Sequence, residues 1–216
     1  MSDKLVLYRH NLPHIHPEGY PLFITFRLAD SLPTKVLAEL RSQREQELVK
    51  LKGHSDSERY QVEKKYFGRY DDWLDLCEHG PRWLEEGSVA QIVADKMHNM
   101  DRERYLLNAF CIMPNHAHVL FKPILSEPAN HQGKSARYPA SETMRLLKGS
   151  TAHDCNLELK RSGKFWHHES YDHYVRDESE MARIIHYIRN NPVKAGLVKN
   201  WRDWPYSYVS PESGEW

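Results

Sequence analysis

The residues best placed to do chemistry are His116 and His118, in the segment MPNHAHVLF at 113–121. If this segment is a β-strand, alternate side chains share one face, so both imidazoles point the same way and can hold one metal ion. The simpler alternative is two partly exposed histidines on an edge strand. The position after a Met-Pro-Asn turn, between two apolar runs, favours a central strand, where two buried polar rings need partners.

A tyrosine and an asparagine stand one turn apart in an expected helix at Glu178–Asn191, which Pro192 is expected to stop. Its apolar stripe consists of Met181, Ile184, Ile185 and Ile188. This stripe leaves Arg183, Tyr187 and Asn191 together on a different face. The alternative is an interfacial tyrosine and an asparagine that only caps the helix. Two imidazoles leave a divalent ion short of ligands, and a helix packed on the strand could supply Asn191 as the third.

Other metal or disulfide sites are not supported by the spacing of their residues. His14 and His16 lie between prolines in a segment without a strand pattern, so we expect a surface loop there. The cysteines are Cys77, Cys111 and Cys155. Their odd number and scattered positions predict neither a disulfide framework nor a zinc site, which is typical of a cytoplasmic protein.

The composition is that of an ordinary globular protein of 216 residues, with 40% apolar and 28% charged residues. Thirty basic side chains balance thirty acidic ones, which argues against a polycation that coats nucleic acid. Locally the charge is uneven. The segment 131–165 has seven basic and three acidic residues, whereas 71–86 has one basic and six acidic. We therefore expect a basic groove beside an acidic helical face that repels phosphate.

The pattern of apolar residues predicts an α+β protein with a mostly antiparallel sheet and helices on one face. Strands are expected at Leu22–Leu28, Tyr105–Met113 and His116–Pro123, and as a short pair within Phe165–Arg176. Helices are expected at about Thr34–Leu51, at about Glu58–Leu76, from Ser88, from Ser141 to Ala152, and at Glu178–Asn191. No apolar stretch is long enough to span a membrane.

Together these residues resemble a known family. MPNHAHVLF at 113–121 with YIRNNPVKAGLV at 187–198 resembles the single-tyrosine transposases of the HUH superfamily, in particular the REP-associated tyrosine transposases. Further similar segments are FITFRLADSLP at 23–33, MRLLKGSTA at 144–152, FWHHESYDHYVRDE at 165–178 and WPYSY at 204–208. The similarity covers nearly the whole chain, least clearly at 40–87 and 125–138.

The resemblance implies a ferredoxin-like or RRM-like HUH fold over residues 1–216, with a helical insertion at about 34–87 and a C-terminal tail at about 197–216. His116 and His118 match the two metal-binding histidines of the family, Tyr187 matches its nucleophile, and Asn191 occupies the position of its third metal ligand. Ala117 departs from the bulkier apolar residue that is usual between the histidines. Because its side chain faces the other side of the sheet, we expect looser packing and unchanged chemistry.

The resemblance further implies a metal-dependent nickase and strand transferase for single-stranded DNA, which acts on REP-type hairpins through a 5′-phosphotyrosine. The expected ion is Mg²⁺ or Mn²⁺, and two imidazoles favour Mn²⁺ somewhat. Contacts to DNA are expected from Arg27, Arg145, Lys148, Lys164, Trp166, Arg176, Arg183 and Arg189. The expected protein is a monomer or homodimer in the bacterial cytoplasm, associated with the nucleoid while it acts.

Two other functions remain open at this point. A nucleic-acid-binding regulator derived from a transposase would not require His116, His118, Tyr187 and Asn191 together, so the presence of all four argues against it. A metal-dependent nuclease that uses water would cleave DNA without a covalent bond to the protein.

Overall fold

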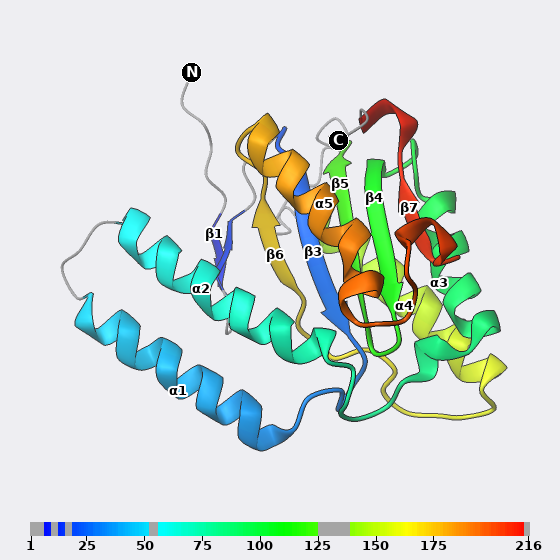
Figure 1. Ribbon diagram of the computed structural model, residues 1–216, viewed down its shortest axis with the longest axis horizontal. Helices are drawn as coiled ribbons and strands as arrows, with labels where there is room; N and C mark the ends of the chain where they lie inside the picture. The colour runs from blue at the N-terminus through cyan, green and yellow to red at the C-terminus, as the bar shows by residue number, and fades with distance from the viewer. Residues whose placement is uncertain (1–6, 10–12, 16–18, 52–55, 125–138, 214–216) are drawn as a thin grey trace, which may run out of the picture.

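The computed structural model describes residues 7–9, 13–15, 19–51, 56–124 and 139–213. At its centre is a five-stranded antiparallel sheet with the strand order β6-β3-β5-β4-β7 (Figure 1). The strands are β3 (Leu22–Arg27), β4 (Tyr105–Met113), β5 (His116–Pro123), β6 (Tyr171–Tyr174) and β7 (Ser207–Val209). The α+β class and the antiparallel sheet expected from the sequence are confirmed.

Five α-helices accompany the sheet in the described part of the chain. They are α1 (Thr34–Lys50), α2 (Asp56–Asp75), α3 (Gly87–Asn99), α4 (Pro139–Glu158) and α5 (Glu178–Lys194). Short 3-10 helices lie at η1 (Trp83–Glu85), η2 (Trp201–Asp203) and η3 (Pro211–Ser213), and a separate hairpin consists of β1 (Leu7–Arg9) and β2 (Pro13–Ile15). No helix among the described residues is long and apolar enough to cross a membrane.

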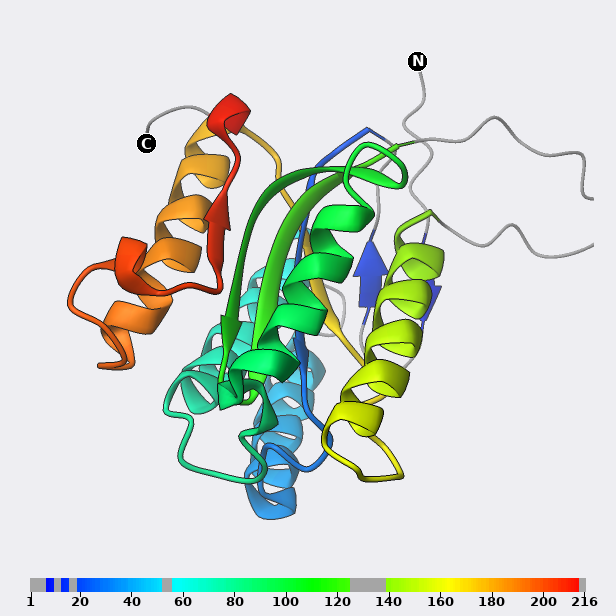
Figure 2. The same ribbon diagram turned by 90° about the vertical axis from the view of Figure 1, so that its right-hand side faces the viewer.

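The helices cover both faces of the sheet, so the prediction that they lie on one face is wrong. One face packs on α3 and α4, with Phe26 among its buried residues. The other face packs on α5 and on the end of α2, with Phe23, Ile185 and Ile188 in its core (Figure 2). Every residue of β3 is buried. Its first three residues, Leu22 to Ile24, are apolar on both faces, and Thr25 and Arg27 then lie on the face that carries His116 and His118.

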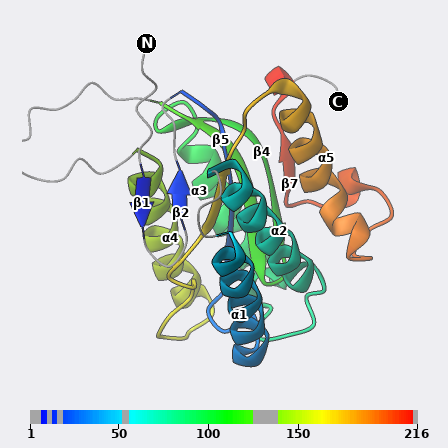
Figure 3. The same ribbon diagram turned by 90° about the vertical axis from the view of Figure 1, so that its left-hand side faces the viewer.

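Helices α1 and α2 form an antiparallel pair that extends from the side of the sheet (Figure 3). A bidentate ion pair joins them, with both guanidinium-to-carboxylate distances between Arg44 and Glu63 at 2.7 Å. Phe67 of α2 packs on the sheet side by stacking on Tyr171, with ring centres 3.6 Å apart. These contacts place the acidic C-terminal end of α2 against the face of the sheet that carries α5.

Helix α5 continues through Pro192 to Lys194, so the prediction that Pro192 stops the helix is wrong. Proline removes one backbone donor, and only one helical turn follows it, so little hydrogen bonding is lost. Asn191 lies inside the helix, where its backbone carbonyl accepts from the backbone N–H of Ala195 and its side chain donates to His118. Its side chain is therefore not used as a helix cap.

Two smaller predictions also change. The short strand pair expected within 165–176 is a single strand, β6, preceded by an isolated bridge between Leu28 and Trp166. His14 lies in β2 and not in a surface loop. His16 lies outside the described residues.

Candidate active site

His116 and His118 lie side by side on one face of β5, as their spacing predicts, and both are fully buried. Their Nε2 atoms are 2.9 Å apart. They face the layer of helices that contains α5 and the end of α2, which converge over this end of the sheet (Figure 1). The site therefore lies where the strand and two helices meet.

Neighbouring oxygens fix the orientation of both imidazoles. His116 Nδ1 lies 2.6 Å from Asn115 Oδ1, which only accepts, so Nδ1 carries the proton and Nε2 keeps its lone pair. His118 Nε2 accepts from Asn191 Nδ2 at 2.7 Å, so its Nδ1 donates to Thr25 Oγ1 at 2.8 Å. The Nε2 lone pairs of His116 and His118 face the same small space, and displacement of the Asn191 N–H from His118 would let them share a cation.

Tyr187 and Asn191 reach the histidines from α5. The Tyr187 ring packs edge-on against His118, with ring centres 5.3 Å apart. Asn191 is 1% exposed, and its Oδ1 is buried without a hydrogen-bond partner among the described residues. A buried acceptor without a partner is rare and is often found where an ion or water belongs. Tyr187 and Asn191, two of the three residues expected on this face of the helix, therefore lie at the site.

Two carboxylates of α2 complete the cluster, and the sequence analysis did not assign them to it. Asp75 Oδ1 lies 3.6 Å from His116 Nε2 and 3.9 Å from His118 Nε2. Asp71 Oδ2 accepts from the Tyr187 hydroxyl at 2.5 Å. Both carboxylates are about 95% buried. The expectation that this acidic segment only repels phosphate is therefore wrong for these two residues, which face the site.

The sequence feature that could have revealed these carboxylates is the four-residue spacing of Asp71 and Asp75, which puts them on one face of a helix. Lys194 of α5 pairs with that face, with its Nζ 3.0 Å from Asp75 Oδ2. Asp75, His116 and His118 together form a cluster whose ligand atoms all lie within 4.8 Å of one another.

The buried charges shift the pKa values of the cluster strongly. Burial, Asp71 and Asp75 raise the pKa of Tyr187 far above its ordinary value, so the hydroxyl is protonated at neutral pH. Burial and the neighbouring Asp75 raise the pKa of Asp71. Although burial alone would raise it, the nearby imidazoles of His116 and His118 hold the pKa of Asp75 below its ordinary value. Asp75 is therefore ionised at neutral pH beside Tyr187.

Burial, together with the nearby His116, lowers the pKa of His118 to about 4. In the unfolded chain the histidine takes up a proton near pH 6.5, whereas in the folded protein His118 stays neutral down to about pH 4. Neutral His118 therefore contributes fully to the free energy of unfolding above pH 6.5, and this contribution is lost as the pH falls towards 4. We expect wild type to lose about 3 kcal/mol more than His118→Gln over this interval. Urea unfolding in a chelator at several pH values measures the difference. Parallel curves for the two proteins would contradict it.

A cavity of about 280 Å³ between α2 and α5 gives access to Tyr187. Lys64 and Arg183 line it together with Asp71 and Asp72. Lys64 pairs with Glu180 at 3.3 Å, so Arg183 is the lining cation that has no ion pair among the described residues. Glu180 also lines this cavity, but Arg176 binds its carboxylate through two contacts of 2.9 Å. Of the expected DNA-binding residues, Arg183 is the one that lies in the same cavity as Tyr187.

The remaining expected DNA-binding residues are dispersed. Arg189 lies over the Trp201 ring, Arg145 pairs with Glu142 on α4, and Lys164 is exposed in the loop after α4. Trp166 is only 6% exposed and donates its ring N–H to Thr151, so it belongs to the core and does not present a stacking surface. Arg27 is 2% exposed, and Lys148 donates to His168 O and Ser170 Oγ near it.

Comparisons with known proteins point to one family. No protein-family model matches the chain. It is 32% identical over 99 residues to a putative REP-associated tyrosine transposase of Haemophilus influenzae, and 28% identical over 118 residues to a REP-associated tyrosine transposase of Escherichia coli K12. The matches cover 46% and 54% of this chain. They span 56% and 62% of the lengths of these curated relatives.

A solved structure of a REP-associated tyrosine transposase bound to a REP hairpin has a similar fold. The TM-score is 0.52 at 19% sequence identity, and the match covers 96% of this chain and 82% of the other. This likeness concerns the arrangement of strands and helices, and the sequence matches concern about half of the chain. By sequence and by fold, the chain is related to the REP-associated tyrosine transposases.

Proposed function

We propose that this protein nicks single-stranded DNA beside a REP-type hairpin and transfers the strand through a 5′-phosphotyrosine on Tyr187. The observation that supports this most is the meeting of Tyr187 and the unpaired Asn191 oxygen with the histidine pair in one buried cluster. Binding alone does not require this set. We further propose a single catalytic domain over 1–216, with the helical insertion at about 34–87 and the tail at about 197–216.

The donor set of the cluster fits a divalent cation. His116 Nε2, His118 Nε2, Asp75 Oδ1 and the unpaired Asn191 Oδ1 would hold it. Imidazole suits manganese better than magnesium, and carboxylate and amide oxygens suit both, so we propose Mn²⁺ or Mg²⁺. Such an ion would polarise a phosphodiester by binding a non-bridging oxygen.

In the proposed reaction the Tyr187 oxygen attacks phosphorus. The new bond joins this oxygen to the 5′-phosphate, and the bond from phosphorus to the 3′-oxygen breaks. The departing 3′-oxygen takes a proton from water and becomes a 3′-hydroxyl. Asp71 already accepts the hydrogen bond of the attacking hydroxyl and would take its proton. A raised pKa makes this carboxylate a stronger base. The phosphotyrosine conserves the bond energy, so another 3′-hydroxyl can reverse the step.

A denaturing gel tests this proposal against the two alternatives. Hairpin DNA with a single-stranded flank is labelled at its 3′ end, because the 5′-phosphate of that fragment would join Tyr187, and is incubated with protein and Mn²⁺. We expect label at the mass of the protein. Cleaved DNA without labelled protein would indicate attack by water, and bound but uncleaved DNA would indicate a regulator.

Thr25 is expected to tune the metal site without touching the ion. Thr25→Val keeps the shape of the side chain and removes the acceptor for His118 Nδ1. Loss of such a partner typically weakens metal binding about 10–100-fold. Titration calorimetry with Mn²⁺ measures the change, with Thr143→Val, an equally buried threonine of α4, as the control. Equal Mn²⁺ affinity for Thr25→Val and wild type would contradict this role.

A further inference from the structure

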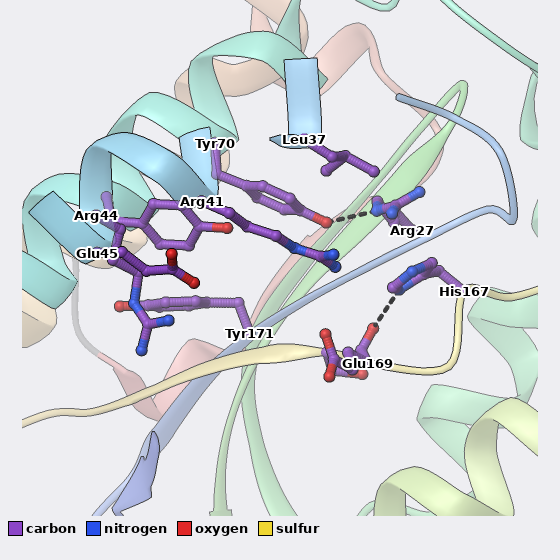
Figure 4. Close-up of a pocket in the computed structure, with 11 residues that line it drawn as sticks. Arg27, Leu37, Arg41, Arg44, Glu45, Tyr70, His167, Glu169 and Tyr171 are labelled. Carbon is purple, nitrogen blue, oxygen red and sulfur yellow. Dashed lines mark hydrogen bonds between the residues drawn. The ribbon is translucent and has the colours of Figure 1, made fainter. Parts of the chain in front are cut away.

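A second cavity, of about 220 Å³, lies on the other side of α2 from Tyr187. We call it the Arg27 pocket. Six of its lining residues matter here: Arg27, Arg41, Tyr66, Tyr70, His167 and Tyr171. They come from β3, from both helices of the α1–α2 pair and from the segment that leads into β6 (Figure 4). The pocket therefore exists because this helical pair is present.

Arg27 is a buried cation with neutral partners only. Its Nε donates to the Tyr70 hydroxyl, and its Nη1 donates to Leu28 O at 3.3 Å and to Ser31 Oγ at 3.2 Å. Among the residues that the structure describes, no carboxylate lies within ion-pair distance of it. A buried guanidinium without a counter-ion is costly, and it lines a cavity large enough for a ligand. An anionic ligand would balance its charge.

Further cations surround Arg27. Arg41 points into the pocket (Figure 4) and has no ion pair within the described ranges. Burial, together with the charge of Arg27, lowers the pKa of Lys148 to about 8 and that of His167 to about 4. Glu45 and Glu169 also line the pocket and offset part of this positive potential. Arg44 is already paired with Glu63, so Arg27 and Arg41 are the guanidiniums available to an anion.

Aromatic rings supply a surface for a base. Tyr70 and Tyr171 line the pocket and are partly exposed, whereas Tyr66 is 8% exposed and has Arg44 over its ring. Tyr171 is held rigidly by its stack on Phe67. Stacking of a base on an aromatic side chain contributes about 1–3 kcal/mol and tolerates any sequence. A surface that binds single-stranded DNA combines arginines, which bind phosphate, with aromatic rings, on which the bases stack. The pocket contains both.

The pocket also lies next to the proposed catalytic cluster. Arg27 is paired in register with His116, so both side chains are on the same face of the sheet. Tyr70 lines the pocket, while the next residue, Asp71, bonds to Tyr187. Tyr171 lines both this pocket and the cavity that contains Tyr187. A strand whose phosphate is at Tyr187 can therefore continue past Tyr171 into the pocket.

We propose that the Arg27 pocket binds one nucleotide of the single strand close to the cleaved phosphodiester, with its phosphate on Arg27 and Arg41 and its base against the tyrosine rings. This inference rests on the proposed function, because it takes single-stranded DNA as the substrate. It assigns to the α1–α2 pair a direct part in holding that strand.

Fluorescence anisotropy with a labelled oligothymidine tests the pocket in the full chain. We expect Arg41→Ala to bind it about tenfold more weakly, and the slope of log affinity against log salt to fall by about one, as for one lost phosphate contact. The control is Arg69→Ala, which removes an exposed arginine of α2 that bonds to Gln43 and Glu47 outside the pocket. Equal losses in the two variants would overturn the proposal, as would no loss in Arg41→Ala.

Photo-crosslinking locates the base independently of affinity. Oligothymidine with 5-iododeoxyuridine substituted along its length is irradiated on the wild-type protein, and the crosslinked peptides are sequenced. We expect crosslinks at Tyr70 or Tyr171, and crosslinks confined to other regions would contradict the pocket. Neither measurement requires cleavage. If the pocket binds DNA but no phosphotyrosine forms, the catalytic proposal fails and this one stands.

Discussion

Tyr187→Phe is expected to abolish covalent attachment of DNA and to reduce nicking more than about a thousandfold, because the phenylalanine ring has no oxygen to attack phosphorus. The ring would still pack against His118 and Phe23, as the tyrosine ring does. Binding of hairpin DNA should therefore change little. Quantified nicking of labelled hairpin DNA, with binding measured in parallel by anisotropy, checks both expectations.

Stability must be measured in the same variant. Without the hydroxyl, Asp71 Oδ2 loses its donor while it remains buried, which costs about 1–3 kcal/mol. A thermal melt shows whether the protein remains folded at the assay temperature. The matched control is Tyr206→Phe, which removes a hydroxyl that donates to Gly87 O elsewhere in the molecule. Nicking by folded Tyr187→Phe at the wild-type rate would exclude Tyr187 as the nucleophile.

His116→Ala is expected to weaken Mn²⁺ binding more than about a hundredfold and to abolish metal-dependent nicking. Loss of a residue that only orients a ligand already costs about 10–100-fold, and His116 is itself a proposed ligand. Because His116 is fully buried, it cannot touch DNA directly, and we expect affinity for the hairpin to change less than about threefold. Calorimetry with Mn²⁺ and nicking assays measure the two effects.

The control for this variant is His98→Ala, which removes an exposed histidine of α3 on the opposite face of the sheet. It should retain wild-type binding of Mn²⁺ and wild-type nicking. If His116→Ala cleaves DNA as fast as wild type in the presence of Mn²⁺, the metal assignment is wrong. Tyr187 would then remain the proposed nucleophile, and a group other than the metal would stabilise the charge on the phosphate.

The parts of the site that follow from local periodicity were predictable from the sequence. Alternation along a strand placed His116 and His118 on one face, and the helical repeat placed Tyr187 one turn from Asn191. These relations depend only on which secondary structure forms. Which residues meet across elements depends on packing. The meeting of Asn191 with His118 was expected from complementarity of ligands and from the family resemblance.

Asp71 and Asp75 were missed because a charged helix is normally solvated, and six acidic residues in 71–86 fit that interpretation. Their burial depends on how α2 is anchored to the sheet through Phe67 and Tyr171, which are about 100 residues apart in the chain. Trp166 was misjudged for a similar reason, since a single aromatic residue in a loop does not reveal whether it packs inwards. The consecutive apolar residues Leu22, Phe23 and Ile24 at the start of β3 occupy both faces of the sheet, and they were the signal for helices on both sides.

The most direct test is to identify the amino acid that becomes attached to DNA. Wild-type protein is incubated with Mn²⁺ and hairpin DNA that carries a single-stranded flank, the DNA is digested with nuclease, and the tryptic peptides are analysed by mass spectrometry. We predict a nucleotide joined through its 5′-phosphate to Tyr187, absent from Tyr187→Phe. Cleaved DNA with an unmodified Tyr187 peptide, or a nucleotide on another residue, would contradict the proposed mechanism.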